Sequence, residues 1–192
     1  MSLSSTAIAH DEDFKEVQDW AVTPSSSTNP PQIMEDLKEH VRYMMYGRKR
    51  EPIFIRHTAT SKSRFDNRDD RQRNDYCQKH FQSIRVNDKY KGKLKGRVVC
   101  VFDDYLTNGN TFEALRNLLI NCGVEKIIFV SIGKFKSAGE SQYVQKSFSI
   151  EGDVYSGKYK AKFETVAKHN VKFDDAARRS LENLMQLAEH LQ

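Results

Sequence analysis

The chain has 192 residues, of which 38% are hydrophobic and 30% are charged, so it is long enough and apolar enough to bury one substantial core. This composition excludes a disordered chain and makes a second catalytic domain unexpected. Lys and Arg outnumber Asp and Glu by 31 to 26, and the net charge of +5 mildly favours anionic partners, such as phosphorylated metabolites or nucleic acid.

The sequence also sets expectations for the compartment. No apolar run reaches the roughly 18 to 20 residues of a bilayer-spanning helix, and the first residues lack the cationic start and apolar core of a secretory signal. The cysteines, Cys77, Cys100 and Cys122, lack the paired spacing of a zinc or disulfide framework, so reduced thiols are expected. We therefore expect a cytoplasmic protein with no membrane partner.

Residues 1–31 are predicted to form an N-terminal arm or linker that is partly disordered. The segment mixes acidic and serine-rich stretches and ends in TPSSSTNPP, a composition that resists regular structure. A short helix over residues 13–22, anchored by Trp20, is compatible with the pattern. Residues 32–192 are then the folded domain, with a C-terminal extension from residue 141 onward.

The folded domain is predicted to begin with a core-facing helix over residues 32–46. Four apolar positions follow helical spacing: Ile33, Leu37, Val41 and Met45. Residues 52–55 (PIFI) form a short apolar run that predicts a buried strand, and the polar segment RHTATSKSR after it predicts a loop. Residues 68–81 are strongly charged and are interpreted as partly helical.

A unit of strand, helix and strand is predicted over residues 98–132. Residues 98–102 and 127–132 are the two apolar strands, and a buried stripe at helical spacing predicts a helix between them that ends at Gly123. Asn110 and Glu113 approximate a capping box at the start of this helix. Because parallel strands need such a crossover, the unit indicates an α/β fold with a mostly parallel central sheet flanked by helices.

The last third of the chain changes character. Residues 142–162 carry aromatic and β-branched residues broken by EGD and SG, which predicts an antiparallel hairpin. Residues 174–191 predict an amphipathic helix whose apolar stripe has heptad-like spacing. Too few heptads are present for a coiled coil, so core packing is favoured over a dimer seam, and a homodimer is left open.

The stretch DDYLTNGNT, residues 103–111, carries the chemistry. It lies at the end of the first parallel strand, where open α/β sheets bind their ligands. Gly109 lets the backbone approach a ligand, and the first turn of the next helix offers unpaired N–H donors that suit a phosphate. Asp103 and Asp104 would repel that phosphate, so they are expected to bind a cation or to accept hydrogen bonds from sugar hydroxyls.

VVCVFDDYLTNGNT resembles the 5-phosphoribosyl 1-pyrophosphate (PRPP) motif of type I phosphoribosyltransferases. The shared features are four apolar strand residues, two acids, two apolar residues, and then Thr, Gly and Thr at fixed offsets. The resemblance implies the type I phosphoribosyltransferase (Rossmann-like) fold and implies that Asp103 and Asp104 hold the ribose 2- and 3-hydroxyls. It also implies that one loop wraps the 5-phosphate: Thr107, Asn108, Gly109, Asn110 and Thr111.

The resemblance extends, less specifically, to earlier segments. In the family, Mg²⁺ and a loop after an earlier strand carry the departing pyrophosphate. RHTATSKSR stands at that position, with the candidates Arg56, His57 and Lys62. Within the family, the chain is most similar to ComF-like and amidophosphoribosyltransferase-type members. ComF-like members carry a segment similar to SRFDNRDDRQRNDYCQKHFQSIRV. This similarity implies secondary candidates: Arg71, Arg73, Asn74 and Phe81. The implied metal is Mg²⁺, bound through the substrate's pyrophosphate, with Asp103 and Asp104 as further candidate ligands.

Two positions depart from the family pattern. Asn108 stands where a small hydroxyl residue is usual, which changes one phosphate contact in kind, although an amide N–H still donates to an oxyanion. Thr107 stands where the hypoxanthine-guanine enzymes carry an aspartate that protonates or deprotonates the purine. This difference argues against a 6-oxopurine salvage enzyme of that type.

Three functions remain open from the sequence. The first is a Mg²⁺-dependent phosphoribosyltransferase that uses PRPP and a nitrogen acceptor, and the second is a non-catalytic module that binds PRPP or nucleotides. The third, suggested by the ComF-like similarity, is an accessory protein of single-stranded DNA uptake. It ranks last because the chain lacks the interleaved aromatic and basic pattern of base-stacking surfaces. Acidic pairs after apolar strands also occur in receiver domains, so the choice depends on the loop that follows.

Overall fold

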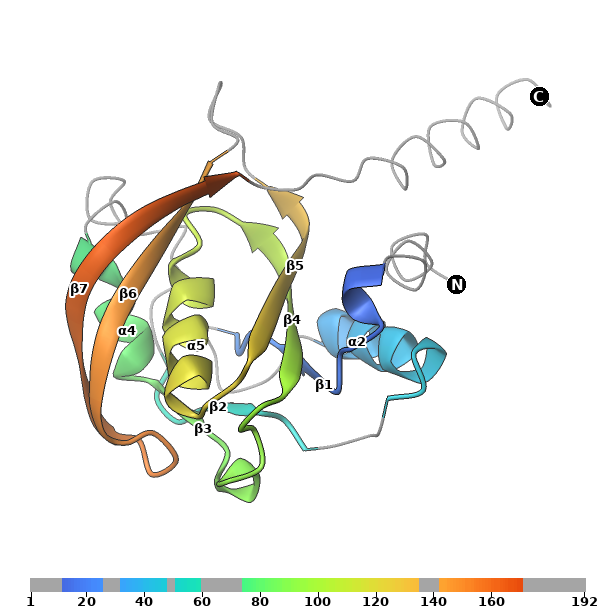
Figure 1. The fold of residues 1–192 in the computed structure, drawn as a ribbon, viewed down its shortest axis with the longest axis horizontal. Helices are drawn as coiled ribbons and strands as arrows, with labels where there is room; N and C mark the ends of the chain where they lie inside the picture. The colour runs from blue at the N-terminus through green and yellow to red at the C-terminus, as the bar shows by residue number, and fades with distance from the viewer. Residues whose placement is uncertain (1–11, 26–31, 48–50, 60–73, 135–141, 171–192) are drawn as a thin grey trace.

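The computed structural model describes residues 12–25, 32–47, 51–59, 74–134 and 142–170. Its centre is a parallel sheet of three strands in the order β1-β4-β5, shown in Figure 1. The strands are β1 (Asp19–Val22), β4 (Val98–Leu106) and β5 (Lys126–Lys134). The predicted α/β class and the parallel strand, helix, strand unit are therefore confirmed at this level.

The two faces of the sheet are covered by different helices. Val99 and Val101 of β4 face a core that includes α5 (Asn110–Asn121), whereas Cys100 and Phe102 face a second core that includes α2 (Gln32–Met44). This division follows from the two-residue period of a strand, which sends alternate side chains to opposite faces. Both faces are apolar, so β4 has the continuous apolar sequence of a central parallel strand.

β1 overturns the predicted helix over residues 13–22. A 3₁₀ turn, η1 (Glu12–Phe14), precedes it, and residues 19–22 then pair in parallel with residues 99–102 of β4. Trp20 is buried with its ring stacked near Phe14 and Phe102, at centroid distances of 6.5 and 5.9 Å. Trp20 is an anchor, as predicted, but it anchors a strand of the central sheet.

A smaller antiparallel sheet lies below the central one in Figure 1. It pairs β2 (Phe54–Arg56) with β3 (Ile84–Val86), and η4 (Asp88–Tyr90) follows β3. The predicted strand at PIFI is thus present, shifted to end at Arg56. The charged segment before β3 is helical in its described part, as η3 (Asn74–Cys77) and α4 (Gln78–Phe81).

The predicted hairpin is present and longer than expected. β6 (Gln142–Asp153) pairs antiparallel with β7 (Lys158–Asn170), with an irregularity at Ser147 and Phe148. The hairpin covers the side of α5 that faces away from the central sheet (Figure 1), and Asn117 of α5 joins the two by hydrogen bonds to the backbone of Lys146 and Phe148. α5 therefore lies between two sheets.

Two further expectations were a C-terminal amphipathic helix and the absence of a bilayer-spanning helix. The predicted helix over residues 174–191 lies outside the described residues. Within the ranges that the structure describes, no helix combines the length and hydropathy that crossing a bilayer requires.

Candidate functional site

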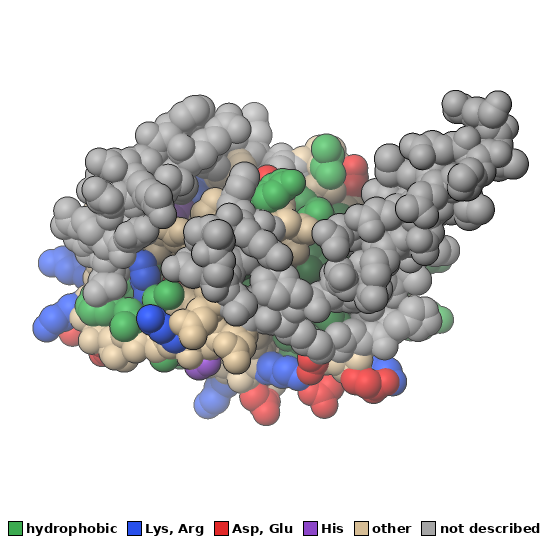
Figure 2. All heavy atoms as spheres, turned by 90° about the horizontal axis from the view of Figure 1, so that it is seen from above, with side chains coloured by type: hydrophobic (Ala, Val, Ile, Leu, Met, Phe, Trp, Pro, Cys, Tyr) green, Lys and Arg blue, Asp and Glu red, His purple; other side chains and the backbone are tan. Residues whose placement is uncertain are grey.

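The candidate site lies where β4 leaves the central sheet and the chain enters α5. β4 was expected to end at Phe102, but it pairs with β5 as far as Leu106, opposite Lys134. Asp103 and Asp104 are therefore residues of the strand itself, and only Thr107, Asn108 and Gly109 separate it from α5. Figure 2 views the molecule from this end, where acidic and hydrophobic side chains of described residues lie together.

The two aspartates differ in their surroundings. Asp103 is half-buried, and its Oδ1 accepts hydrogen bonds from Thr23 Oγ1 at 2.6 Å and from the Asp104 backbone N–H at 3.0 Å. Asp104 is exposed, and its Oδ1 accepts from the Tyr105 backbone N–H at 2.7 Å. One carboxyl group is thus held in place by the end of β1, while the other faces solvent.

Burial raises the pKa of Asp103 to about 7. The Thr23 hydrogen bond opposes this shift, and the neighbouring Asp104 carboxylate adds to it. An Asp side chain in an unfolded chain ionises near pH 3.9, so the folded state holds this proton more tightly than the unfolded state. Asp103 therefore changes charge close to neutral pH, at the position where a sugar hydroxyl or a cation is expected to bind.

This shift predicts a pH-dependent stability. The free energy of unfolding of the wild type, relative to Asp103→Asn, should fall as the pH rises from about 4 to about 7 and level off above that, because deprotonation disfavours the folded state. Urea unfolding at several pH values measures it. Asp153→Asn is the control: the pKa of exposed Asp153 is lowered, mainly by the Tyr155 backbone N–H, so its contribution is constant from about pH 5 upward. A parallel pair of curves for the wild type and Asp103→Asn would contradict the shift.

Gly109 shapes the loop between β4 and α5. Its φ of 69° lies in the left-handed region, and it is the N-cap of α5, with its carbonyl accepting from the Glu113 backbone N–H at 2.9 Å. The predicted capping box is wrong, because Asn110 is already the first helical residue and no side chain caps the helix. The first-turn N–H groups of α5 consequently follow a residue that has no side chain of its own to accept their hydrogen bonds.

Tyr143 of β6 lies against Gly109. A Cβ built on Gly109 would be 2.6 Å from Tyr143 Cε2, closer than carbon atoms approach in proteins. The Tyr143 hydroxyl in turn donates to Glu113 Oε1 at 2.6 Å, and burial, reinforced by the Glu113 carboxylate, raises the pKa of that hydroxyl. The hairpin therefore closes one side of the loop, a contact that the sequence pattern did not reveal.

Gly109→Ala should lower the free energy of unfolding more than Gly96→Ala does. The left-handed backbone alone costs an alanine about 1–2 kcal/mol. Gly96 has a similar φ of 71° with nothing described within 4 Å of its Cβ position, so Gly96→Ala isolates that cost. Urea unfolding followed by circular dichroism should give a larger loss for Gly109→Ala, by the cost of displacing Tyr143. Equal losses would show that the contact is relieved without cost.

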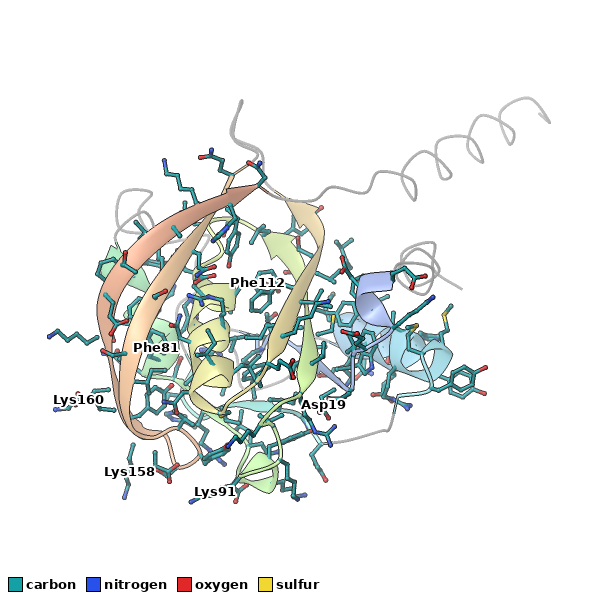
Figure 3. All side chains as sticks on the ribbon, in the orientation of Figure 1. Asp19, Phe81, Lys91, Phe112, Lys158 and Lys160 are labelled. Atoms are coloured by element: carbon teal, nitrogen blue, oxygen red, sulfur yellow. The ribbon has the colours of Figure 1, made fainter. Side chains whose placement is uncertain are left out.

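The start of α5 is surrounded by polar side chains from three elements. Asn110 is buried, and its Oδ1 accepts from Lys146 Nζ at 2.7 Å and from Cys77 Sγ at 3.7 Å. Thr111 Oγ1 lies 3.5 Å from His80 Nε2. Phe112, labelled in Figure 3, stacks on Phe129 of β5 at a centroid distance of 4.3 Å and fixes the helix start over the sheet.

Asp103 and the loop share a small cavity. Its volume is about 20 Å³, and its lining includes Asp103, Thr107, Gly109 and Thr111. Such a space holds about one water molecule, so a sugar phosphate would extend from it across the neighbouring exposed residues, Asp104 and Asn108. The structure thus brings Asp103 together with four of the five predicted phosphate-loop residues: Thr107, Gly109, Asn110 and Thr111.

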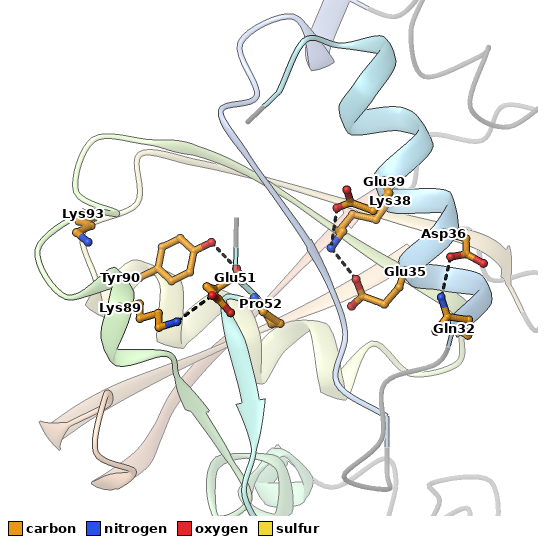
Figure 4. A pocket seen from close by; sticks show the side chains of 10 residues that line it. All are labelled: Gln32, Glu35, Asp36, Lys38, Glu39, Glu51, Pro52, Lys89, Tyr90 and Lys93. Carbon is orange, nitrogen blue, oxygen red and sulfur yellow. Dashed lines mark hydrogen bonds and ion pairs between the residues drawn. The ribbon is translucent and has the colours of Figure 1, made fainter. Parts of the chain in front are cut away.

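A larger groove, of about 820 Å³, lies elsewhere. Figure 4 shows it between α2 and the segment around η4, with Glu35 and Glu39 on one side and Glu51 and Lys89 on the other. Lys38 pairs with Glu35 and Glu39, and Lys89 pairs with Glu51. No predicted site residue within the described ranges lines this groove, and its described charged groups pair largely with one another.

Arg56, a predicted pyrophosphate-loop residue, is buried and bonded to the chain itself. Its guanidinium donates to Ser83 Oγ at 2.5 Å, to the Pro24 carbonyl at 3.2 Å and to the Ser25 carbonyl, and burial lowers its pKa to about 10. Thr23, next to these carbonyls, donates to Asp103. The segment from Thr23 to Ser25 therefore links Arg56 to the candidate site.

The remaining candidates are placed only in part. His57 is exposed, with its Nδ1 3.0 Å from Thr58 Oγ1. Lys62, Arg71 and Arg73 lie outside the described residues, and of Asn74 the structure describes only the backbone, at the start of η3. These residues stay predictions.

No protein-family model matches the chain, and no curated protein does. The resemblance to phosphoribosyltransferases therefore depends on the residues from Val98 to Thr111 alone.

Asp103 and Asp104 are suited to Mg²⁺. Proteins usually hold this ion with one or two carboxylates, several waters and the substrate's phosphates, and Asp104 is exposed enough to take part. Within the described ranges, no three or more His, Cys, Asp or Glu side chains gather into a metal-binding group.

Proposed function

We propose that this protein binds PRPP at the junction of β4 and α5 and transfers the phosphoribosyl group to a nitrogen acceptor, releasing pyrophosphate. The observation that carries the proposal is the position of the motif. Its acidic pair lies on a central parallel strand, and its Gly109 loop leads directly into a helix N-terminus. Parallel α/β sheets bind phosphorylated ligands at such junctions.

The two halves of the motif have complementary roles in this proposal. Asp103 and Asp104 accept hydrogen bonds from the ribose hydroxyls, and the first-turn N–H groups of α5, with the hydroxyls of Thr107 and Thr111, donate to the 5-phosphate. The ribose hydroxyls need hydrogen-bond acceptors, whereas the phosphate needs donors. The acids therefore lie on β4, and the donors lie in the loop and the first turn of α5 that follow it. The sugar ring bridges them.

The reaction is a substitution at C1 of the ribose. The acceptor's nitrogen lone pair forms the new C1–N bond while the C1–O bond breaks, its electron pair leaves with pyrophosphate, and the nitrogen loses its proton to solvent. The aspartates orient the ring as positive charge develops on it, and their negative charge stabilises that state. Mg²⁺, held by the substrate's pyrophosphate with Asp103 and Asp104, would supply charge neutralisation for the leaving group.

A second function, PRPP or nucleotide binding without turnover, is favoured by one observation. Arg56, the first cation of the candidate pyrophosphate loop, donates to carbonyls of residues 24 and 25 and to Ser83. Its guanidinium then serves the fold, and the stabilisation of departing pyrophosphate falls to other groups. A chain that binds the sugar phosphate but stabilises the leaving group weakly would bind PRPP and release little pyrophosphate.

One assay separates these functions. The protein is incubated with PRPP and Mg²⁺ and with a panel of purine and pyrimidine bases, ammonia and glutamine, while pyrophosphate release is followed, and PRPP binding is measured in parallel by calorimetry. Release that depends on one acceptor supports the transferase. Binding without release for any acceptor supports the non-catalytic module, and absence of both contradicts the two together.

A further inference from the structure

Lys146 is a buried cation that contacts the start of α5. Only 4% of its surface is exposed, and its Nζ donates to Asn110 Oδ1 at 2.7 Å. Asn110 is the first residue of α5 and one of the residues of the phosphate loop. Lys146 belongs to β6, 36 positions after Asn110 in the sequence, so this contact depends on how the hairpin packs on α5.

The position is electrostatically costly for a cation. The N-terminus of a helix carries a partial positive charge, so a cation there opposes the helix dipole, and burial of the ammonium group adds a desolvation cost. Glu113, the nearby carboxylate, is bonded to Arg116 at 2.9 Å, to the Tyr143 hydroxyl and to the Lys146 backbone N–H. A phosphate at the loop would be attracted by both the helix end and the ammonium group.

We propose that Lys146 is a positioning residue for the phosphate group of the ligand, acting through Asn110. This inference rests on the proposed function, because it assigns a role to a residue outside the motif at the same site. The Lys146 charge raises the affinity of the α5 N-terminus for a dianionic phosphate, and its hydrogen bond fixes the orientation of the Asn110 amide. The hairpin is then part of the binding site rather than a cover over α5.

The geometry of β6 supports a joint action of hairpin and loop. Tyr143 contacts Gly109 and Lys146 contacts Asn110, so two consecutive loop residues each meet a side chain of the same strand. Asn117 and Arg116 hold the Lys146 backbone carbonyl at 2.8 Å each, which fixes the strand at this point. The backbone that carries the ammonium group is therefore held in place relative to α5.

The test compares two substitutions with ribose 5-phosphate as the probe. Lys146→Gln removes the charge but keeps an N–H donor for Asn110, whereas Lys146→Met removes both. Calorimetry should show binding about tenfold weaker for Lys146→Gln, because the attraction between the buried ammonium group and the phosphate is lost, and weaker still for Lys146→Met. Lys162→Gln, at an exposed position of the same hairpin, is the matched control and should bind like the wild type.

The outcomes distinguish the inference from the proposed function. If the unsubstituted protein binds neither PRPP nor ribose 5-phosphate, the proposed function is contradicted and the role of Lys146 with it. If it binds both and Lys146→Gln binds equally well, only the role of Lys146 is overturned. Affinity lost in Lys146→Met alone would indicate that orientation of Asn110, not charge, is the contribution, and would overturn the electrostatic role.

A measurement on the wild type covers the case in which neither variant folds. The ¹⁵N resonance of Lys146 Nζ, assigned through its side-chain carbons, should shift when ribose 5-phosphate saturates the protein, and that of Lys162 should not. A Lys146 resonance that is unchanged at saturation would overturn the inference.

Discussion

Replacing Asp103 and Asp104 together by asparagine is expected to abolish measurable PRPP binding while leaving the fold intact. Each carboxylate accepts a hydrogen bond from a ribose hydroxyl in the proposed complex, and hydrogen bonds to charged groups contribute about 1.5–3 kcal/mol each. Losing both should weaken binding on the order of 100-fold or more. The asparagine side chains keep the size of the originals, and removal of the half-buried Asp103 charge should not destabilise the sheet. Calorimetry with PRPP and Mg²⁺ measures the effect.

The matched control changes two acids at exposed positions of the hairpin. The double variant Glu151→Gln, Glu164→Gln alters the net charge by the same amount, so a general electrostatic effect on an anionic ligand would appear in it equally. Unchanged binding in the control with lost binding in the aspartate variant supports the site. Retained binding in the aspartate variant would contradict both the transferase and the non-catalytic binding module.

Glu113→Ala is expected to cost about 3–5 kcal/mol in the free energy of unfolding, the range observed when one partner of a buried ion pair is removed. Glu113 is fully buried, and its carboxylate accepts from Arg116, the Tyr143 hydroxyl and the Lys146 backbone N–H. All three donors would be left in the interior between α5 and β6. Such a loss is a large fraction of the roughly 5–15 kcal/mol that stabilises a typical domain.

Chemical unfolding of Glu113→Ala, Glu113→Gln and Glu164→Ala measures this contribution. Glutamine preserves an acceptor and the side-chain volume, so Glu113→Gln should lose less than Glu113→Ala. Glu164 is exposed on β7, and its alanine variant should lie within about 0.5 kcal/mol of the wild type. A loss below about 1 kcal/mol for Glu113→Ala would show that the donors find water when the carboxylate is removed.

The central part of the fold was predictable because its signals are local. β4 and β5 are continuous apolar runs, the stripe between them has helical spacing, and Gly123 ends the helix with a φ of 80°. β1 was missed because WAV is too short an apolar run to distinguish a strand from a helical turn, and its pairing with β4 is a long-range contact. The end of β4 was also missed, since two adjacent aspartates are more typical of a loop.

The candidate site divides in the same way. The motif from Asp103 to Thr111 is contiguous, so its residues could be named from the sequence. Thr23, Tyr143 and Lys146 reach the site only through tertiary packing, and no spacing in the sequence relates them to the motif. For Glu113 the local pattern was misleading, because its spacing from Asn110 suggested a cap whereas the carboxylate turns toward the hairpin.

The pairing of β1 with β4 has a consequence for the order in which the protein folds. β4, α5 and β5 are neighbours in sequence and can form their contacts over short loops, whereas Gln18 meets Val98 across 80 residues at the start of this pairing. Closing that loop costs entropy before any contact offsets it, so β1 should join the sheet late. During synthesis, β1 waits for its partner strand to leave the ribosome. Until then Trp20 lacks Phe102 and Cys100, its partners in that core, and the nascent chain exposes the apolar side chains of β1 without a strand to pair with.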